Sequence, residues 1–235
     1  MTRSYVVTGG GRGIGRAVVE RLLADGGAVI VIELDESALD WADAHPARDR
    51  ITAVIGDAGD EAVVDRAADL AQQAGELAGW VNNSAVFRDA SVHDTPTRRI
   101  RELISNNLDP ALTGCAVAIR RFLAAGTKGA IVNVSSHQAR QAVPGCTPYV
   151  TAKAAIEGLT RALAVEYGRH GIRVNAVAPG SVDTERYQDL LRRSGPEEAA
   201  RIEREMGRLH PLGRLARADE VASVIVWLLS DATSF

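Results

Sequence analysis

Short apolar runs alternate with longer amphipathic stretches along almost the whole chain. The runs have the length of β-strands, and the stretches between them repeat apolar residues at helical spacing. Strands are predicted at residues 4–8, 28–33, 51–55, 78–82, 129–134 and 172–177. This alternation predicts an α/β fold whose parallel sheet is covered by helices on both faces. Ligands of such sheets bind beyond the carboxyl ends of the strands, so residues just after the strands are the first site candidates.

The first predicted strand runs into a glycine-rich loop, TGGGRGIG at residues 8–15, and a helical stretch follows. Glycines at 9, 13 and 15 allow the backbone to turn tightly and to approach a ligand closely. A helix that begins near Gly13 directs free N–H groups and the positive end of its dipole toward a phosphate. Strand, loop and helix in this order predict a pyrophosphate site, with plain turns as the alternative use of the glycines.

Glu33 ends the second predicted strand, twenty residues after Gly13. At that distance a carboxylate reaches the adenosine ribose in dinucleotide-binding βαβ units. A carboxylate accepts hydrogen bonds from the ribose hydroxyls and repels a 2′-phosphate, so Glu33 favours NAD over NADP. Arg12 argues for NADP, because a guanidinium beside the loop pairs well with the extra phosphate. A solvated strand end is the alternative for Glu33.

Tyr149 and Lys153 stand four residues apart in a helical stretch, and Ser136 follows the fifth predicted strand. Residues at i and i+4 share a helix face, with Cβ atoms about 5–6 Å apart, so the Lys153 ammonium is expected to act on the Tyr149 phenol. A nearby cation lowers the pKa of a phenol from about 10, which suits proton exchange with a substrate oxygen. The Ser136 hydroxyl is expected to hydrogen-bond the same oxygen. The alternative is three ordinary residues on a helix face and a turn.

In order along the chain, these motifs resemble those of the short-chain dehydrogenase/reductase family, from residue 4 to residue 235. The loop at 8–15 resembles the family's T-G-x-x-x-G-x-G motif. VNNSA at 81–85 resembles N-N-A-G, and APGSVDT at 178–184 resembles P-G-x-x-x-T.

The resemblance implies a single domain of Rossmann-like, doubly wound type over residues 1–235, and an NAD(P)-dependent oxidoreductase that interconverts a secondary alcohol and a ketone. Tyr149 is the implied acid and base, and Ser136 polarises the substrate oxygen. Lys153 tunes Tyr149 and bonds the nicotinamide ribose. Asn107 holds a water of a proton relay, with Asn106 beside it as a one-residue ambiguity.

The cofactor is expected to be NAD, with NADP as the less favoured alternative. Asp57 is implied to contact adenine, and Val182 and Thr184 to contact the nicotinamide carboxamide. The full set of implied cofactor contacts is Gly9, Arg12, Gly13, Ile14, Gly15, Glu33, Asp57, Ala58, Asn83, Tyr149, Lys153, Pro179, Gly180, Val182 and Thr184. An NADPH-dependent 3-oxoacyl reductase and a catalytically silent nucleotide-binding scaffold are the alternative functions.

The largest loop-like insertion runs over residues 181–213. Its charge density and its central Ser-Gly-Pro predict two short helices that close over the substrate as a mobile lid. After the helical stretch DEVASVIVWLLS the chain stops, whereas the family continues into a last strand that completes the sheet. We attribute the missing strand to truncation, and the alternative is a partner subunit that covers the strand at 174–178.

The predicted substrate is a small secondary alcohol or ketone, in a pocket lined by Gln138, Arg140, Cys146, Thr147 and the lid. Polar His137 and Gln138 suggest a polyol or sugar. Val143 with the pair Leu190 and Leu191 suits an acyl or cyclic ketone instead. The sequence leaves both open.

Composition and charge argue against several classes of partner and site. The formal charge is −3, and the arginine clusters at 98–101, 120–121 and 192–193 are expected on solvated helix faces, so no nucleic acid partner is indicated. Two cysteines give neither a disulfide framework nor metal-ligand spacing, and no metal is predicted. With no signal peptide and no apolar run of membrane length, the cytoplasm is expected and a membrane is not. Long apolar stripes at 96–122 and 149–168 suggest a homodimer or homotetramer.

Overall fold

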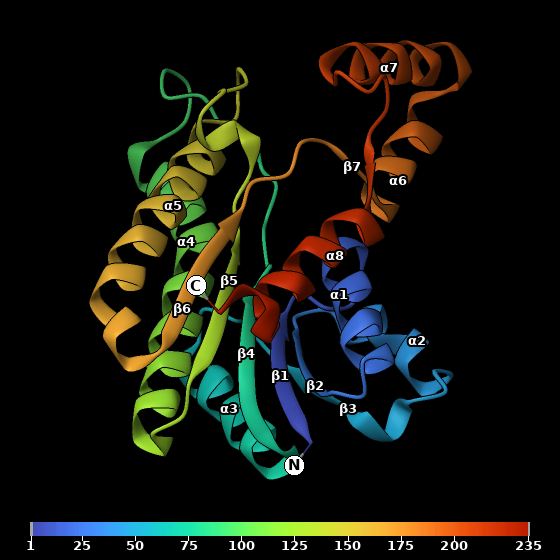
Figure 1. Cartoon of the computed structure of the whole chain (residues 1–235). Coiled ribbons are helices and arrows are strands. Elements are labelled where there is room, and N and C mark those ends of the chain that lie inside the picture. The colour runs from blue at the N-terminus through green and yellow to red at the C-terminus, as the bar shows by residue number, and fades with distance from the viewer. Residues whose placement is uncertain (1, 235) are drawn as a thin grey trace.

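The computed structural model describes residues 2–234 as a six-stranded parallel sheet flanked by helices (Figure 1). The strand order is β3-β2-β1-β4-β5-β6, and every neighbouring pair is parallel. The strands are β1 Arg3–Thr8, β2 Ala28–Glu33, β3 Ile51–Ile55, β4 Glu76–Asn82, β5 Gly129–Val134 and β6 Ile172–Val177. All six predicted strands are confirmed. The winding reverses between β1 and β4, and this reversal opens a crevice at their carboxyl ends.

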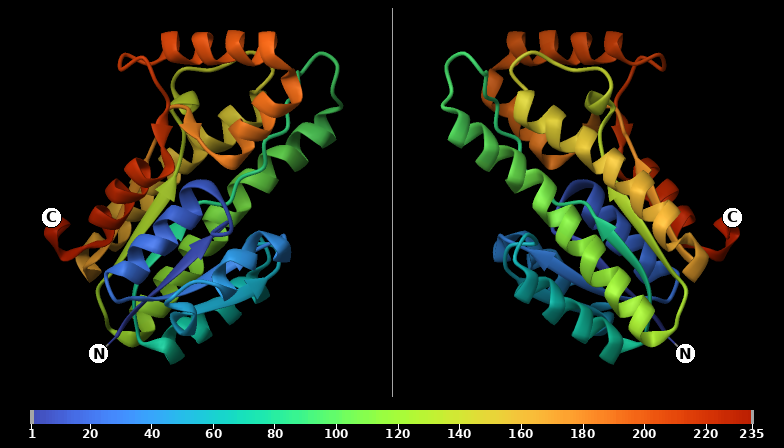
Figure 2. Two further views of the ribbon diagram at one scale, coloured as in Figure 1. Left: turned by 90° about the vertical axis from the view of Figure 1, so that its right-hand side faces the viewer. Right: turned by 90° about the vertical axis from the view of Figure 1, so that its left-hand side faces the viewer.

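Helices cover both faces of the sheet (Figures 1 and 2). One apolar core lies between the sheet and α3, α4 and α5, and the other lies between the sheet and α1 and α8. Burial on both faces is why the strands appear as continuous apolar runs in the sequence. The helices are α1 Gly13–Ala24, α2 Asp40–Asp43, α3 Glu61–Ala74, α4 Thr97–Ala125, α5 Thr147–Tyr167, α6 Glu185–Ser194, α7 Pro196–Leu209 and α8 Ala218–Leu229.

A buried polar network joins the neighbouring strands β4 and β5 to α5. Asn82 of β4 and Asn133 of β5 are register partners, and Asn82 Nδ2 donates to Asn133 Oδ1 at 2.8 Å. Asn133 Nδ2 donates to Thr160 Oγ1 of α5 at 2.9 Å, and Trp80 Nε1 donates to Asn82 Oδ1 at 3.0 Å. A register slip of one residue would leave these buried groups without partners, so the network fixes how β4, β5 and α5 align.

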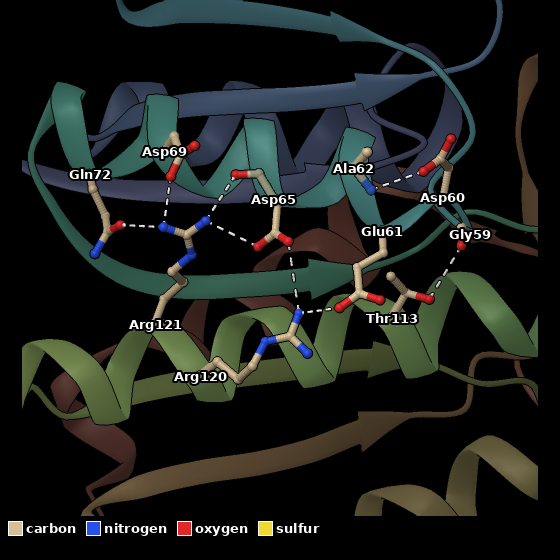
Figure 3. Close-up of polar contacts among 10 residues, drawn as sticks. All are labelled: Gly59, Asp60, Glu61, Ala62, Asp65, Asp69, Gln72, Thr113, Arg120 and Arg121. Carbon is tan, nitrogen blue, oxygen red and sulfur yellow. Dashed lines mark hydrogen bonds and ion pairs between the residues drawn. The ribbon is translucent and has the colours of Figure 1, made fainter.

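Two arginines of α4 pair with carboxylates of α3 (Figure 3). Arg121 lies 3.0 Å from Asp65 and 2.6 Å from Asp69, and its side chain is only 25% exposed. Arg120 pairs with Glu61, which also lies in α3. Arg120 is exposed, as expected for a solvated face, whereas Arg121 is half-buried because the neighbouring helix supplies acidic side chains in register with it.

The segment after β6 forms two helices joined to the domain by a second, two-stranded parallel sheet of β7 Val182–Asp183 and β8 Ala216–Arg217. Gly195, with φ +75°, separates α6 from α7, which begins at Pro196. The predicted pair of short helices is confirmed. Neither helix contains a buried residue, and α7 projects away from the main sheet in Figure 1.

Candidate active site

The glycine loop between β1 and α1 has a conformation that favours glycine at two points. Gly9 and Gly13 have φ of +65° and +54°, in the left-handed region. A Cβ on Gly15 would lie 2.0 Å from the Gly9 carbonyl oxygen, so the loop folds tightly onto the start of the helix. Asn83, just after β4, donates from Nδ2 to the carbonyl oxygens of Gly9 at 2.9 Å and Thr8 at 3.2 Å. This contact holds the loop against the neighbouring strand end.

The free N–H groups of this loop are occupied by carboxylates of the protein itself. Gly13 N–H, at the start of α1, donates to Glu185 Oε2 of α6 at 2.9 Å. Gly11 N–H donates to Glu33 Oε2 at 3.0 Å. The helix has no side-chain cap from its own N-cap residue, Arg12. A carboxylate drawn to this position indicates that the helix N-terminus fits an anionic group, and the diphosphate of a dinucleotide is such a group.

The atoms around Gly13 also limit the space above the loop. Thr184 Cγ2 lies 3.1 Å from the position that a Gly13 Cβ would occupy, and Glu185 Oε2 follows at 3.8 Å. Protein atoms of the segment after β6 therefore cover part of the crevice that the sequence predicts to be open for a cofactor.

Glu33 and Arg12 lie at the end of β2, where an adenosine ribose is expected, and both have protein partners. Glu33 Oε1 accepts from the Leu34 N–H at 2.9 Å, so this carboxylate organises the loop rather than standing free as a solvated strand end. Arg12 Nη2 pairs with Asp35 Oδ2 at 2.6 Å. The guanidinium expected to favour a 2′-phosphate is therefore already beside a carboxylate.

The other implied cofactor residues lie at the same edge of the sheet. Asp57, after β3, accepts from the Gly59 N–H at 2.8 Å, and Ala58 beside it is buried. Pro179, after β6, accepts from the His137 N–H at 3.0 Å. Ile14 packs against the core beneath α1. Next to Gly180, the Ser181 N–H donates to His210 Nε2 at 3.0 Å.

Tyr149 and Lys153 lie on one side of α5 and are both buried, at 8% and 2% exposure. The Lys153 ammonium is 5.5 Å from the centre of the Tyr149 ring. Its hydrogen bond goes elsewhere, because Nζ donates to the Val134 carbonyl oxygen at the end of β5, at 2.7 Å. Ser135 Oγ donates to the Lys153 carbonyl oxygen at 3.1 Å, so two bonds hold α5 to the end of β5.

The pKa of Tyr149 is raised, whereas the sequence predicts that the neighbouring Lys153 lowers it, so this prediction is wrong in direction. Burial raises the pKa of Tyr149, while the neighbouring Ser136 hydroxyl and the Arg186 guanidinium lower it. Burial also lowers the pKa of Lys153, to about 8. The physical reason is desolvation, which disfavours the phenolate and the ammonium alike.

Ser136 and Asn107 complete the cluster expected from the sequence. Ser136 is buried and its Oγ accepts from the Gln138 N–H at 3.2 Å, which caps the 3₁₀ turn His137–Ala139. Of the two neighbouring asparagines, Asn107 is buried and Asn106 is exposed. Asn107 exchanges hydrogen bonds of 2.9 and 3.0 Å with the backbone of Val86. Its side chain thus anchors the segment after β4 rather than standing free for a water.

Two residues near Tyr149 lie outside every motif and were missed by sequence reasoning. The Phe87 ring packs on the Tyr149 ring with centroids 4.8 Å apart. The Arg186 guanidinium carbon lies 3.7 Å from the centre of the Phe87 ring. Phe87 follows the VNNSA motif by two residues and Arg186 follows Thr184 by two. That proximity to motif ends was the only signal.

Within residues 2–234, no helix is both long and apolar enough to cross a membrane. The same residues contain no group of three or more His, Cys, Asp or Glu side chains arranged to hold a metal ion.

Comparison with known proteins identifies the family. A family profile described as enoyl-(acyl carrier protein) reductase matches residues 9–235. Cis-4-hydroxycyclohexanecarboxylate dehydrogenase of Sinomonas cyclohexanicum is 41% identical, over 99% of this chain and 91% of that protein. The 2,5-dichloro-2,5-cyclohexadiene-1,4-diol dehydrogenase of Sphingobium indicum is 36% identical, over 99% and 92%. The crystal structure of levodione reductase has a TM-score of 0.88 at 29% identity, over 99% and 92%. The chain belongs to the short-chain dehydrogenase/reductase family and is an NAD(P)-dependent oxidoreductase that interconverts a secondary alcohol and a ketone.

Proposed function

We propose that the buried cluster of Tyr149, Ser136 and Lys153 carries the proton chemistry of this oxidoreductase. When bound, the nicotinamide cofactor supplies the hydride acceptor or donor. Tyr149 gives its phenolic proton to the oxygen of a ketone, or takes the proton of an alcohol in the reverse direction. Ser136 donates a hydrogen bond to the same oxygen. Lys153 binds the nicotinamide ribose and adds positive charge beneath Tyr149. The observation that carries the proposal is the burial of all three at the end of β5.

The raised pKa of Tyr149 has a direct consequence for the direction of catalysis. At neutral pH the phenol holds its proton, which is the form that protonates a ketone oxygen during reduction. Oxidation needs the phenolate, whose population rises with pH. We therefore expect ketone reduction to be favoured at neutral pH and alcohol oxidation in alkaline solution.

Replacement of Tyr149 by phenylalanine tests this assignment. Loss of the hydroxyl should lower kcat by about 10²–10⁴-fold, because that is the usual contribution of a positioned acid or base. Cofactor affinity, measured by fluorescence titration with the reduced nicotinamide, should stay within about twofold, because the hydroxyl acts mainly in the transition state. Tyr167→Phe, the same change at the far end of α5, is the matched control. Equal losses of kcat and cofactor binding would indicate a structural role for Tyr149 and contradict the proposal.

The proposed cofactor is NAD rather than NADP. Glu33 and Asp35 place two carboxylates near the end of β2, and Arg12 is paired with one of them. A 2′-phosphate there would meet repulsion from both acids, and its one nearby cation is already compensated. A higher kcat/KM with NADH than with NADPH is expected, and the reverse order would overturn this part of the proposal.

The proposed substrate is a cyclic secondary alcohol or ketone. The exposed Phe87 ring packs on Tyr149, and its neighbour Val86 is exposed too, and such apolar side chains suit a carbocycle better than a polyol. The polar residue expected to favour a sugar, His137, is instead directed at the Pro179 carbonyl oxygen, 3.2 Å from Nδ1. The related enzymes named above act on cyclohexane or cyclohexadiene compounds by their names. A panel of cyclic and open-chain ketones with NADH tests the choice, and faster turnover of open-chain polyol ketones would refute it.

The segment 181–213 is proposed to act as a lid. Its helices contain no buried residue, and its Glu185 occupies the Gly13 N–H that a diphosphate would use. Cofactor binding would therefore displace Glu185 and shift α6. Limited proteolysis with and without NAD⁺ should show a change of cleavage within this segment, and identical cleavage patterns would contradict the lid.

A homodimer or homotetramer built on α4 and α5 is also proposed. Exposed apolar residues on these helices, Leu112, Leu123 and Val165, support it. Analytical ultracentrifugation measures the mass directly, and a monomer at working concentration would refute it.

A further inference from the structure

Arg186 is the arginine of the segment 181–213 that stacks on an aromatic ring beside Tyr149. Arg192 and Arg201 of this segment pair with carboxylates, whereas Arg193, Arg204 and Arg208 make no ion pair among residues 2–234. Within residues 2–234, Arg186 makes no ion pair, and Asp89 is the nearby acid whose charge acts on it. Asp89 lies beyond ion-pair distance and accepts a hydrogen bond from the Cys146 thiol at 3.6 Å. The guanidinium is thus a cation without a carboxylate partner.

The position of this cation relative to the acid-base residue is well defined. The guanidinium carbon lies 3.7 Å from the centre of the Phe87 ring, and Phe87 stacks on Tyr149 at 4.8 Å between centroids. Stacking on an aromatic face holds a guanidinium in a fixed plane while leaving its N–H groups free. Arg186 is exposed, and its charge lowers the pKa of Tyr149, so the cation lies close enough to act on the acid-base residue.

We propose that Arg186 binds a carboxylate on the substrate, at the end opposite to the alcohol or ketone carbon that reacts at Tyr149. This inference rests on the proposed function and narrows its substrate to a cyclic secondary alcohol or ketone that carries a carboxylate. The guanidinium and the Tyr149 ring both contact the Phe87 ring, at 3.7 and 4.8 Å from its centre, so a small molecule that lies along this ring can meet both groups. The planar fork of the guanidinium matches a carboxylate in a bidentate arrangement.

A binding measurement that needs no turnover tests the inference. Cyclohexanecarboxylate and cyclohexanecarboxamide have the same ring, lack the reacting hydroxyl and differ in charge. Calorimetric titration of the NAD⁺-loaded enzyme should show at least about tenfold tighter binding of the carboxylate, because a hydrogen bond to an ion is worth more than a neutral one. The preference should disappear in Arg186→Met and persist in Arg193→Met, which makes the same change on an exposed site of the same helix. Equal affinity of the wild type for both probes, or an unchanged preference in Arg186→Met, would overturn the inference.

A turnover measurement separates this inference from the proposed function. The ratio of kcat/KM for 4-oxocyclohexanecarboxylate to that for its methyl ester should fall at least about tenfold in Arg186→Met relative to Arg193→Met. Higher salt should lower this ratio in the wild type, because ions screen the attraction. If neither ketone is reduced while the carboxylate probe still binds through Arg186, the proposed function is wrong and the anion site stands. If both ketones are reduced at equal rates in the wild type, the function stands and the anion site is wrong.

Discussion

At the scale of single residues, burial shifts the pKa values of Tyr149 and Lys153 more than the proximity of the two side chains does. The spacing i, i+4 correctly predicts that the two side chains share a helix side. The hydrogen bond of Lys153 to the Val134 carbonyl oxygen, 19 residues away in the chain, has no local sequence pattern. The direction of both pKa shifts follows from the atoms packed around the pair, which composition and spacing do not specify.

The first residue-scale prediction concerns the ionisation of Tyr149 in the cofactor-free enzyme. The difference in phenolate absorbance between wild type and Tyr149→Phe should titrate with a midpoint above 10, because burial raises the pKa from the ordinary value of 10.0. In Arg186→Met the same difference should move to still higher pH, since the guanidinium lowers this pKa. A midpoint below 10 would show that a cation, rather than desolvation, dominates.

A second prediction concerns the cost of burying Lys153. Its pKa of about 8 in the folded protein lies below the unfolded value of about 10.4, so the unfolded chain binds more protons between these pH values. Folding stability must then rise with pH in this window and be lowest below pH 8. Urea unfolding should measure the free energy of unfolding of wild type and of Lys153→Met at pH 7 and pH 10. The difference, wild type minus variant, should rise by about 2–3 kcal/mol from pH 7 to pH 10. A pH-independent difference would mean that Lys153 keeps its ordinary pKa.

At the scale of elements, the close approach of α4 to β4 depends on one residue without a side chain. A Cβ on Gly114 would lie 2.0 Å from Asn82 Oδ1 and 2.7 Å from Trp80 Nε1. The long helix can therefore lie against the buried polar network only at a glycine. The sequence shows an apolar stripe on this helix, but not which residue touches the strand.

The matched pair Gly114→Ala and Gly158→Ala tests this close packing. Gly114→Ala should lower the free energy of unfolding by about 1–3 kcal/mol or more, because the network or the helix must shift. A Cβ on Gly158 of α5 would lie 3.9 Å from its nearest neighbour, Arg161 Nη2. Alanine there should therefore raise the free energy of unfolding by about 0.4–1 kcal/mol. Thermal or urea unfolding measures both. Similar effects of the two substitutions would contradict the packing argument.

The contact between α6 and the start of α1 yields another element-scale prediction. Glu185→Gln removes a negative charge from the Gly13 N–H, where a diphosphate is expected, so cofactor affinity should rise about two- to fivefold. Glu197→Gln, the same change in the first turn of α7, is the control and should leave affinity unchanged. Isothermal titration with NADH measures both, and weaker binding in Glu185→Gln would show that this carboxylate supports the cofactor instead.

At the scale of the whole molecule, the fold was predictable because the four inner strands, β2, β1, β4 and β5, are buried on both faces and are therefore largely apolar in sequence. The pair of helices after β6 was predictable from Ser194, Gly195 and Pro196, which interrupt a helical pattern. Contacts between distant segments were not predictable from the sequence. Gly13 and Glu185 are 172 residues apart, and Phe87 and Arg186 meet Tyr149 from two other segments. No local rule joins such residues, so their contribution emerges only from packing.

The two-residue pairing of β7 with β8 brings both ends of the α6–α7 segment together, with the Ala216 N–H on the Ser181 carbonyl oxygen at 3.1 Å. A stretch whose ends meet can change in length or composition with little strain on the sheet beneath it. Tyr149 and Lys153 belong to the rigid part, whereas Arg186 belongs to the exchangeable part. Grafting this stretch from another member of the family should therefore yield chimeras that keep the same redox reaction and accept different molecules, which offers a direct route to new catalysts.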